Sequence, residues 1–228
     1  MAEDEYCVGP TARELFELKN KHPCTDIYVI GAAASMDYID PEFFKGRLVI
    51  GCNTVHHRFP VTYSVFKEGN ADQWRAAAAC STLIVSRHPF GYTNREPMYY
   101  GADFPAYYVF PHRMNYHTAV DWEVLGTDEI VVSYSTITSA IHIAAYMGAK
   151  NVFLCGVDGG RLNGRLNYTD YYTESQVSQH DSWYQGWVRD MLPQTPELRD
   201  RLRQVYGCRV YLMSPFLNFQ LEGHKFEP

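Results

Sequence analysis

The sequence has no excess of basic residues, and this excludes one broad class of function. Its 228 residues contain 20 Lys and Arg against 26 Asp and Glu, which gives a formal net charge of −6 at pH 7. A protein that binds a nucleic-acid backbone neutralises phosphates with clustered Lys and Arg side chains. We therefore expect no nucleic-acid partner, and we interpret the diffuse acidity as a contribution to solubility.

Long apolar runs and paired cysteines are also missing. No apolar stretch approaches the roughly 20 residues that span a bilayer, so we expect no transmembrane segment. The opening MAEDEYCVGP is acidic and polar, unlike a signal peptide. The six cysteines form no C-x-x-C pair, and Cys52 and Cys155 lie within apolar runs, where free cysteine behaves as a small hydrophobe. These features predict a reduced, cytoplasmic protein and are equally compatible with a peripheral position beside a membrane.

The sequence lacks internal repeats and low-complexity linkers, so we expect residues 1–228 to form a single domain. Short apolar runs predict strands at 26–31, 47–53, 61–67, 81–88, 106–110, 129–135, 151–158 and 208–215. The stretches between them predict helices at 11–19, 72–80, 136–150 and 195–207. Apolar strands that alternate with helices are typical of parallel sheets. The predicted fold class is α/β: a Rossmann-like, mostly parallel sheet flanked by helices on both faces.

Residues 159–194 differ in character from the rest of the chain. They are polar, rich in glycine at the start, and dense in Tyr and Trp. Long irregular segments of this kind inside compact domains often form lids or binding loops, so we expect a lid or acceptor-binding segment here. Aromatic residues make up 15% of the chain, with 18 tyrosines, which is more than a core requires. We expect part of this surplus at a ligand site and part at an interface, where it would support a homo-oligomer.

No P-loop and no G-x-G-x-x-G motif occurs, so any nucleotide site must be built differently. The stretch IYVIGAAASMDYID ends a predicted strand with Gly31, three alanines and Ser35. Ligands bind beyond the carboxyl ends of the strands in open parallel sheets, and a turn of small residues there lets backbone N–H groups face a phosphate. Close packing of the strand against a neighbouring element explains the same residues equally well.

Polar residues also stand at the ends of other predicted elements. Asn53 follows the second strand, where its amide would contact a base or ribose or would close an Asx-turn. Thr138 and Ser139 lie in the first turn of helix 136–150, whose positive N-terminus attracts phosphate but whose hydroxyls also serve as caps. Asp158 ends strand 151–158 and would bind a ribose hydroxyl, position a cation or cap a turn. We expect these groups to meet at one edge of the sheet.

Three segments together resemble a known family. IYVIGAAAS, VIGCN and ITSAIHIAAYMGAKNVFLCGVD are similar to segments of the bacterial sialyltransferases that use CMP-sialic acid. They also resemble the broader DUF115 proteins, which include archaeal 6-hydroxymethylpterin pyrophosphokinase-like enzymes. The resemblance covers pieces of residues 26–158 and the final strand VYLMSPFLNF, and the block 137–158 is its most specific part. The chain departs from the family's first motif, Gly-x-Gly-Pro-Ser-Leu, at Ala33 and Ala34.

The resemblance implies a role for each matching residue. Nucleotide contacts would come from Gly31, Ala32, Ser35, Asn53, Thr138, Ser139 and Asp158. The general base that deprotonates the acceptor hydroxyl would be His180, because an imidazole suits base chemistry near neutral pH. The departing phosphate would be held in the region of Tyr168, Tyr171 and Tyr172, or by Arg161 and Arg165.

The resemblance favours a metal-independent glycosyltransferase that moves a sugar from a CMP-type donor to a glycan acceptor and requires no cofactor. One alternative is a Mg²⁺-dependent pyrophosphokinase of the DUF115 type, with Asp158 and Glu68 as metal ligands. Another is a non-catalytic member that binds a nucleotide or a glycan, which the alanines of the first turn favour. The sequence contains no Asp-x-Asp pair and no zinc-ligand spacing, so we expect no resident metal.

Overall fold

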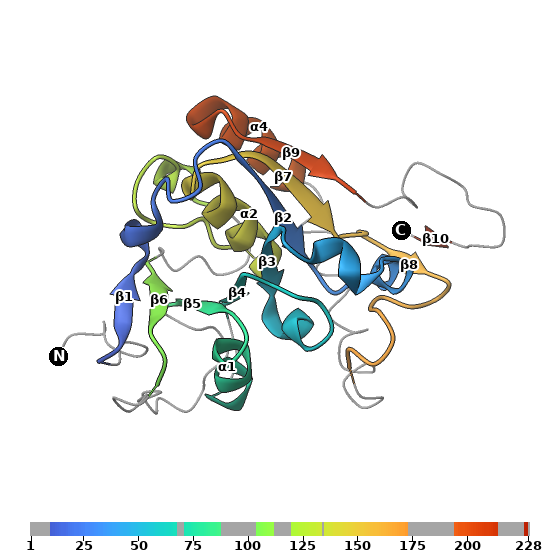
Figure 1. The fold of residues 1–228 in the computed structure, drawn as a ribbon. Coiled ribbons are helices and arrows are strands. Elements are labelled where there is room, and N and C mark those ends of the chain that lie inside the picture. The colour runs from blue at the N-terminus through green and yellow to red at the C-terminus, as the bar shows by residue number, and fades with distance from the viewer. Residues whose placement is uncertain are drawn as a thin grey trace.

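A computed structural model describes residues 10–67, 71–87, 104–111, 120–133, 135–172, 194–213 and 226–227 (Figure 1). Its centre is an eight-stranded sheet with the strand order β1-β6-β5-β4-β3-β2-β7-β9. The strands are β1 (Ala12–Glu14), β2 (Thr25–Ile30), β3 (Leu48–Cys52), β4 (Tyr63–Phe66), β5 (Thr82–Ser86), β6 (Tyr107–Phe110), β7 (Ala149–Cys155) and β9 (Arg209–Leu212). All neighbouring pairs in this sheet are parallel. The predicted α/β fold with a mostly parallel sheet is confirmed, and within this eight-stranded sheet every strand except β1 overlaps a predicted one.

The order of the strands reverses at β2. From β2 the chain builds β3, β4, β5 and β6 to one side and then crosses to the other side, where β7 pairs with β2. The register places Ile27 beside Leu48 of β3 and beside Val152 of β7. Such a reversal leaves a crevice at the carboxyl ends of the two central strands, where open parallel sheets bind their ligands. A separate two-stranded sheet, in which β8 (Arg161–Leu162) and β10 (Phe226–Glu227) are antiparallel, follows β7.

Side chains at alternate positions of each strand point to opposite faces of the sheet, and the buried residues divide accordingly. Ile27 and Val29 of β2 belong to a large cluster that includes α2 (Thr136–Tyr146) and α4 (Gln194–Tyr206). Figure 1 shows α2 lying along the central strands β2, β3 and β7. The central part of the sheet therefore has its main hydrophobic core between these strands and α2.

The intervening side chains form two other clusters. Ile30 of β2 packs with residues of three short helices, η2 (Ala34–Tyr38), η3 (Pro41–Phe44) and η4 (Asn53–His57). Farther along the sheet, Leu83 and Val85 pack with Trp74 of α1 (Ala71–Ala78). The short helices η2 and η4 directly follow β2 and β3, so their position is fixed by the ends of the central strands. They form the frame of the site described below.

Helix α2 begins at the predicted residue and ends at Tyr146, four residues before the predicted bound. The Ser135 side chain accepts a hydrogen bond from the Ile137 N–H at 3.2 Å, which caps the N-terminus. The helix is followed by Gly148 at φ +94, a conformation that favours glycine. All eleven residues of α2 are buried, so this helix lies between the sheet and α4 rather than at the surface.

Two predicted elements differ from the structure. Residues 11–19 form β1 and the short helix η1 (Leu15–Leu18) instead of one amphipathic helix, although Leu15 and Leu18 are buried as expected. Residues 130–133 are buried but form no strand, and at Val131 side chains of α2 bond the backbone in place of a neighbouring strand. The Val131 N–H donates to Nδ1 of His142 at 2.9 Å, and the Val131 carbonyl accepts from the Ser139 hydroxyl at 3.0 Å. Residue 134 lies outside the described residues.

The structure bears on two further expectations, one about the cysteines and one about membrane spans. Cys52 and Cys155 are buried free thiols, and burial raises the pKa of the Cys155 thiol to about 12. Both therefore behave as the small hydrophobic residues that their apolar runs predict. Among the described residues, no helix has the length and apolar character needed to cross a membrane.

Candidate functional site

A polar pocket of about 660 Å³ lies at the carboxyl ends of the central strands. Three segments form its wall: η2, which follows β2; η4, which follows β3; and the segment 165–171, which follows β7 and β8. The lining residues are Asp37, Tyr38, Thr54, His57, Arg58, Arg165, Tyr168, Thr169, Asp170 and Tyr171. The pocket thus lies beside the point at which the strand order reverses, the usual ligand position in open parallel sheets.

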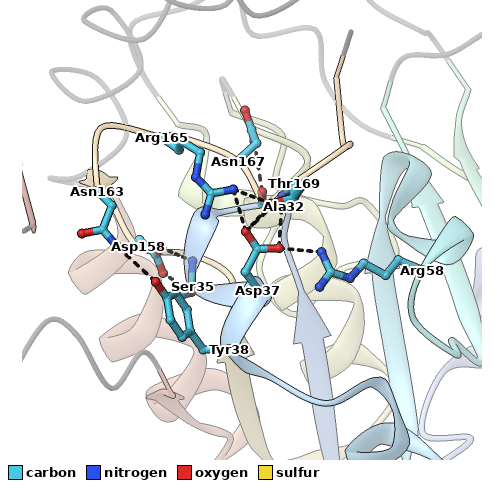
Figure 2. Close-up of polar contacts among 10 residues, drawn as sticks. All are labelled: Ala32, Ser35, Asp37, Tyr38, Arg58, Asp158, Asn163, Arg165, Asn167 and Thr169. Carbon is cyan, nitrogen blue, oxygen red and sulfur yellow. Dashed lines mark hydrogen bonds and ion pairs between the residues drawn. The ribbon is translucent and has the colours of Figure 1, made fainter. Parts of the chain in front are cut away.

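Asp37 joins the three segments of the pocket wall. Its Oδ1 accepts from Nη1 of Arg58 at 2.6 Å, and its Oδ2 pairs with Nη1 of Arg165 at 2.7 Å. The Thr169 hydroxyl also donates to Oδ2 at 2.9 Å, and the Thr169 N–H approaches both oxygens at 3.1 Å. Figure 2 shows the carboxylate pointing between the two guanidinium groups. One side chain of η2 is therefore bonded to the other two segments at the same time.

The surroundings of Asp37 keep it ionised. Burial acts to raise the pKa of this carboxyl, but hydrogen bonds from Arg58, Thr169 and Arg165 outweigh burial and lower the pKa below its usual value. The carboxylate is thus a permanent counter-ion of two arginines at neutral pH. With Asp170 also in the wall, the pocket contains two carboxylates and two guanidiniums.

The Arg58 guanidinium is held by aromatic rings against its flat face as well as by the bond from Nη1 to Asp37. Its guanidinium carbon lies 5.0 Å from the centre of the Tyr168 ring and 5.4 Å from that of Phe59. Cation–π contacts of this kind attract and orient a guanidinium. The Arg58 side chain is 32% exposed and that of Arg165 is 44% exposed, whereas Asp37 is only 14% exposed. The two arginines therefore present charge to the pocket, while Asp37 anchors them from behind.

The small-residue turn that follows β2 is packed closely against the loop that follows β7. A Cβ added to Gly31 would lie 2.4 Å from the carbonyl oxygen of Gly156, and one added to Gly156 would lie 2.6 Å from that of Gly31. The N–H groups of Gly31, Ala33 and Ala34 donate to the carbonyls of residues 155, 156 and 166. Gly31 has no side chain because two backbones approach each other here. Several of the N–H groups predicted to face a phosphate are bonded within the protein.

The Ala32 carbonyl also takes part in this packing. It accepts from the Tyr168 N–H and from the Asn167 side-chain amide, each at 3.1 Å. These bonds tie the turn to the segment that lines the pocket, as Figure 2 shows for Asn167. Ala32 therefore supports the position of Tyr168, while its own nucleotide contact stays a prediction.

Asp158 and Ser35 face each other inside the protein. The Asp158 carboxylate, which is 2% exposed, accepts from the Ser35 hydroxyl at 2.5 Å and from the Ser35 N–H at 2.9 Å. A carboxylate at the N-terminus of η2 satisfies donors that the helix leaves unpaired. Of the uses that the sequence suggested for Asp158, the structure shows a capping contact.

This contact leads to a prediction about stability. Ser35→Ala removes a hydroxyl that donates to a buried carboxylate, and we expect it to lower the free energy of unfolding by about 1.5 to 3 kcal/mol. Ser64→Ala is a matched control, because the buried Ser64 hydroxyl bonds the neutral Ser81 hydroxyl at 2.7 Å, and such a bond contributes about 1 kcal/mol. Urea unfolding of both variants measures the difference. Equal losses would contradict a charged partner for Ser35.

Asn53 adopts a left-handed backbone conformation with φ +55, which asparagine tolerates better than most residues. Its side-chain oxygen accepts from the Thr136 hydroxyl at 3.4 Å, so the end of β3 and the start of α2 lie together as predicted. The Thr138 hydroxyl accepts from the Ser133 hydroxyl at 2.6 Å, and both Thr138 and Ser139 are buried. Asn53 is the most accessible of these predicted nucleotide contacts.

The residues predicted to hold a leaving phosphate divide into two groups. Tyr168, Tyr171 and Arg165 line the pocket, and Tyr172 contacts the Tyr171 ring at a centroid distance of 4.4 Å. Burial raises the pKa of the Tyr168 and Tyr171 phenols, so both stay protonated at neutral pH and can donate hydrogen bonds. Arg161 is not part of the lining; its Nη1 donates to the Gly164 carbonyl at 3.2 Å.

Several pocket residues were not predicted from the sequence. They are Asp37, Tyr38, Thr54, His57, Arg58, Thr169 and Asp170. Four of them have a signal in the sequence: Asp37 stands six residues after predicted strand 26–31, and Thr54, His57 and Arg58 stand within five residues of the end of predicted strand 47–53. Only the fold brings these segments together.

The remaining predicted site residues lie outside the described residues. These are His180, proposed as the general base, and Glu68, proposed as a Mg²⁺ ligand under the pyrophosphokinase alternative. Within the described parts of the chain, no group of three or more His, Cys, Asp or Glu side chains is placed to hold a metal ion. Comparisons of the chain with protein-family models, with curated proteins and with solved structures find no match.

Proposed function

We propose that this protein is a nucleotide-dependent transferase that binds the phosphate of its donor in the pocket between η2, η4 and residues 165–171. The simplest version is a metal-independent glycosyltransferase that moves a sugar from a CMP-type donor to a glycan acceptor. In this proposal the sheet acts as a Rossmann-like nucleotide-binding sheet, with the donor placed where the strand order reverses. The resemblance of the sequence to CMP-sialic-acid-dependent sialyltransferases supports the choice of donor.

One observation carries the proposal: two arginines, Arg58 and Arg165, converge on one carboxylate inside a pocket at the carboxyl ends of β2 and β3. Guanidinium groups form strong, often paired hydrogen bonds with phosphate. The phenol of Tyr168 adds a neutral donor, while the Tyr171 phenol is hydrogen-bonded to the side chains of Thr54 and Asn53. Groups fixed in this way stabilise negative charge that develops on a leaving phosphate without reorganising during the reaction.

The proposed reaction is a displacement at the anomeric carbon. The oxygen of the acceptor hydroxyl forms a bond to that carbon while the bond from the carbon to the phosphate oxygen breaks. The electron pair of the broken bond leaves on the phosphate, which the arginines neutralise. The hydroxyl proton passes to an imidazole, for which the sequence offers His180 and the pocket wall offers the exposed His57.

Binding of nucleotides tests the proposal directly. We expect CMP or CDP to bind the wild-type protein in titration calorimetry, ahead of UMP, GDP and ATP, and we expect chelation of metals to leave binding unchanged. Arg58→Gln should weaken binding by about tenfold to a hundredfold, because a hydrogen bond to a charged group contributes about 1.5 to 3 kcal/mol. Arg47→Gln is the control, because Arg47 precedes β3 at the opposite end of the parallel strands and contacts Phe43.

The outcomes of this experiment are distinct. Absence of binding by every cytidine nucleotide would overturn the CMP-type donor, and equal binding by Arg58→Gln and Arg47→Gln would overturn the phosphate site. Release of CMP from CMP-sialic acid, with water as the acceptor, then measures turnover. Loss of release in His180→Ala or His57→Ala, with binding retained, identifies the base. Tight binding without any release would show a non-catalytic nucleotide-binding protein.

A further inference from the structure

The two pocket arginines have unused hydrogen-bonding capacity. In the part of the chain that the structure describes, the hydrogen bonds and ion pairs of Arg58 and Arg165 are all made by Nη1. A guanidinium carries five N–H donors in a fixed plane. Among the described residues, the edge formed by Nε and Nη2 of each arginine therefore has no partner, and this edge can bind two oxygens of one anionic group.

The contacts of Asp37 determine where these edges point. Its two oxygens hold one Nη1 each, so the two guanidiniums can lie no farther apart than two hydrogen bonds and the width of one carboxylate. Thr169 fixes the carboxylate through three contacts from its N–H and hydroxyl. Without this anchor, and counting only the described residues, Arg58 would keep only its ring contacts and Arg165 only its bond to the Thr169 hydroxyl. Both guanidinium groups would then be less restricted, and binding would have to offset the loss of that freedom.

We propose that Asp37 is a positioning residue that makes the pocket a site for a phosphate or diphosphate group. The carboxylate holds both arginines by Nη1, and their free edges bind the several anionic oxygens of the ligand. This inference rests on the proposed function, because the ligand group is the phosphate of the donor, and it adds the residue that organises the site. If Asp37 only contributed negative charge, its removal would strengthen binding of an anion. If it positions the arginines, its removal weakens that binding.

Three roles for Asp37 predict three different orders of affinity. If Asp37 only repels the ligand, Asp37→Asn should bind pyrophosphate more tightly than the wild type. If only the shape of the side chain matters, the isosteric Asp37→Asn should bind nearly as the wild type does, and the longer Asp37→Glu should bind worse. If the carboxylate positions the arginines, Asp37→Asn should lose at least about tenfold in affinity. Asp37→Glu should then recover part of the loss, because its carboxylate still reaches the arginines.

The experiment measures binding of pyrophosphate and of CMP by titration calorimetry to the full chain and to these two variants. Asp40→Asn is the matched control: Asp40 is exposed, lies three residues away and caps η3 by accepting from the Glu42 N–H, which asparagine also does. It should bind as the wild type does. Thr169→Val leaves every charge in place and removes one anchor of Asp37, and it should weaken binding severalfold. This variant keeps the test decisive if Asp37→Asn fails to fold.

The two probes separate the inference from the proposed function. Binding of both probes by the wild type, with Asp37→Asn and Thr169→Val as tight or tighter, overturns the positioning role and leaves the proposed function standing. Binding of pyrophosphate but not of CMP, with loss in both variants, supports the positioning role and overturns the CMP-type donor. Binding of neither probe by the wild type overturns both.

Discussion

Gly156→Ala is expected to lower the free energy of unfolding by about 2 to 5 kcal/mol. Gly156 has φ +64, a conformation that costs other residues about 1 to 2 kcal/mol. A Cβ there would also lie 2.4 Å from Cγ of Met36 and 2.6 Å from the Gly31 carbonyl oxygen. Met36 is fully buried, so its side chain has little room to move, and such overpacking costs about 1 to 3 kcal/mol more. Urea unfolding monitored by circular dichroism measures the loss.

Gly164→Ala separates the two contributions. Gly164 has φ +76, but a Cβ at this position meets nothing within 4 Å. It should therefore show only the backbone cost of about 1 to 2 kcal/mol. If Gly156→Ala and Gly164→Ala were equally destabilising, the close approach of the β2 and β7 loops would not be a packing constraint.

The second large effect concerns the buried His142. Its Nδ1 accepts from the Val131 N–H, so the ring proton is on Nε2, which donates to the Tyr206 hydroxyl at 2.9 Å. Burial lowers the pKa of this imidazole from 6.5 to about 3. As pH falls below about 6.5, the unfolded chain takes up a proton that the folded protein does not. Stability should thus fall by about 1.4 kcal/mol per pH unit from this residue alone, between about pH 6 and about pH 4.

A variant that does not titrate isolates this contribution from that of the carboxylates. In His142→Asn the amide oxygen can still accept from the Val131 N–H, while the bond to Tyr206 is lost. We expect this variant to be less stable at pH 7 by about 1 to 3 kcal/mol but to lose less stability on acidification. Denaturant unfolding at several pH values provides both curves. Parallel curves below pH 6 would show that His142 already carries a proton in the folded protein.

The strands could be predicted because their sequences determine them locally. Runs such as DIYVIG and STLIVSRH are apolar on both faces, which a parallel strand requires. Residues 129–135 are similarly apolar and were predicted as a strand. In the structure the side chains of Ser139 and His142 form the backbone hydrogen bonds of Val131 that a neighbouring strand would form. No local sequence pattern indicates such bonds. Residues 11–19 are too few for an apolar pattern to distinguish a helix from a strand followed by a short helical turn.

The site could be predicted only in part, for a related reason. Tyr168, Tyr171 and Arg165 were singled out and do line the pocket. Asp37 and Arg58 were not, because nothing near either residue in the sequence shows that they pair across 21 positions. The small residues that follow β2 were assigned two equal explanations, and close backbone packing accounts for Gly31. Hydroxyl side chains at the start of a helix, such as that of Ser139, have the same sequence pattern whether they bind a ligand or the protein itself. In the structure the Ser139 hydroxyl donates to the Val131 carbonyl.

The place of β1 in the sheet has a consequence for biosynthesis. β1 leaves the ribosome long before its partner β6, in which Tyr107 lies beside Ala12 of β1. β2 also pairs with β7, which is synthesised later than β6. A nascent chain can assemble β2 to β6 in order of emergence, but one side of β2 stays open as a template for pairing with other chains. The wall of the pocket includes residues 165–171, so the pocket is complete only after translation has passed β7 and β8.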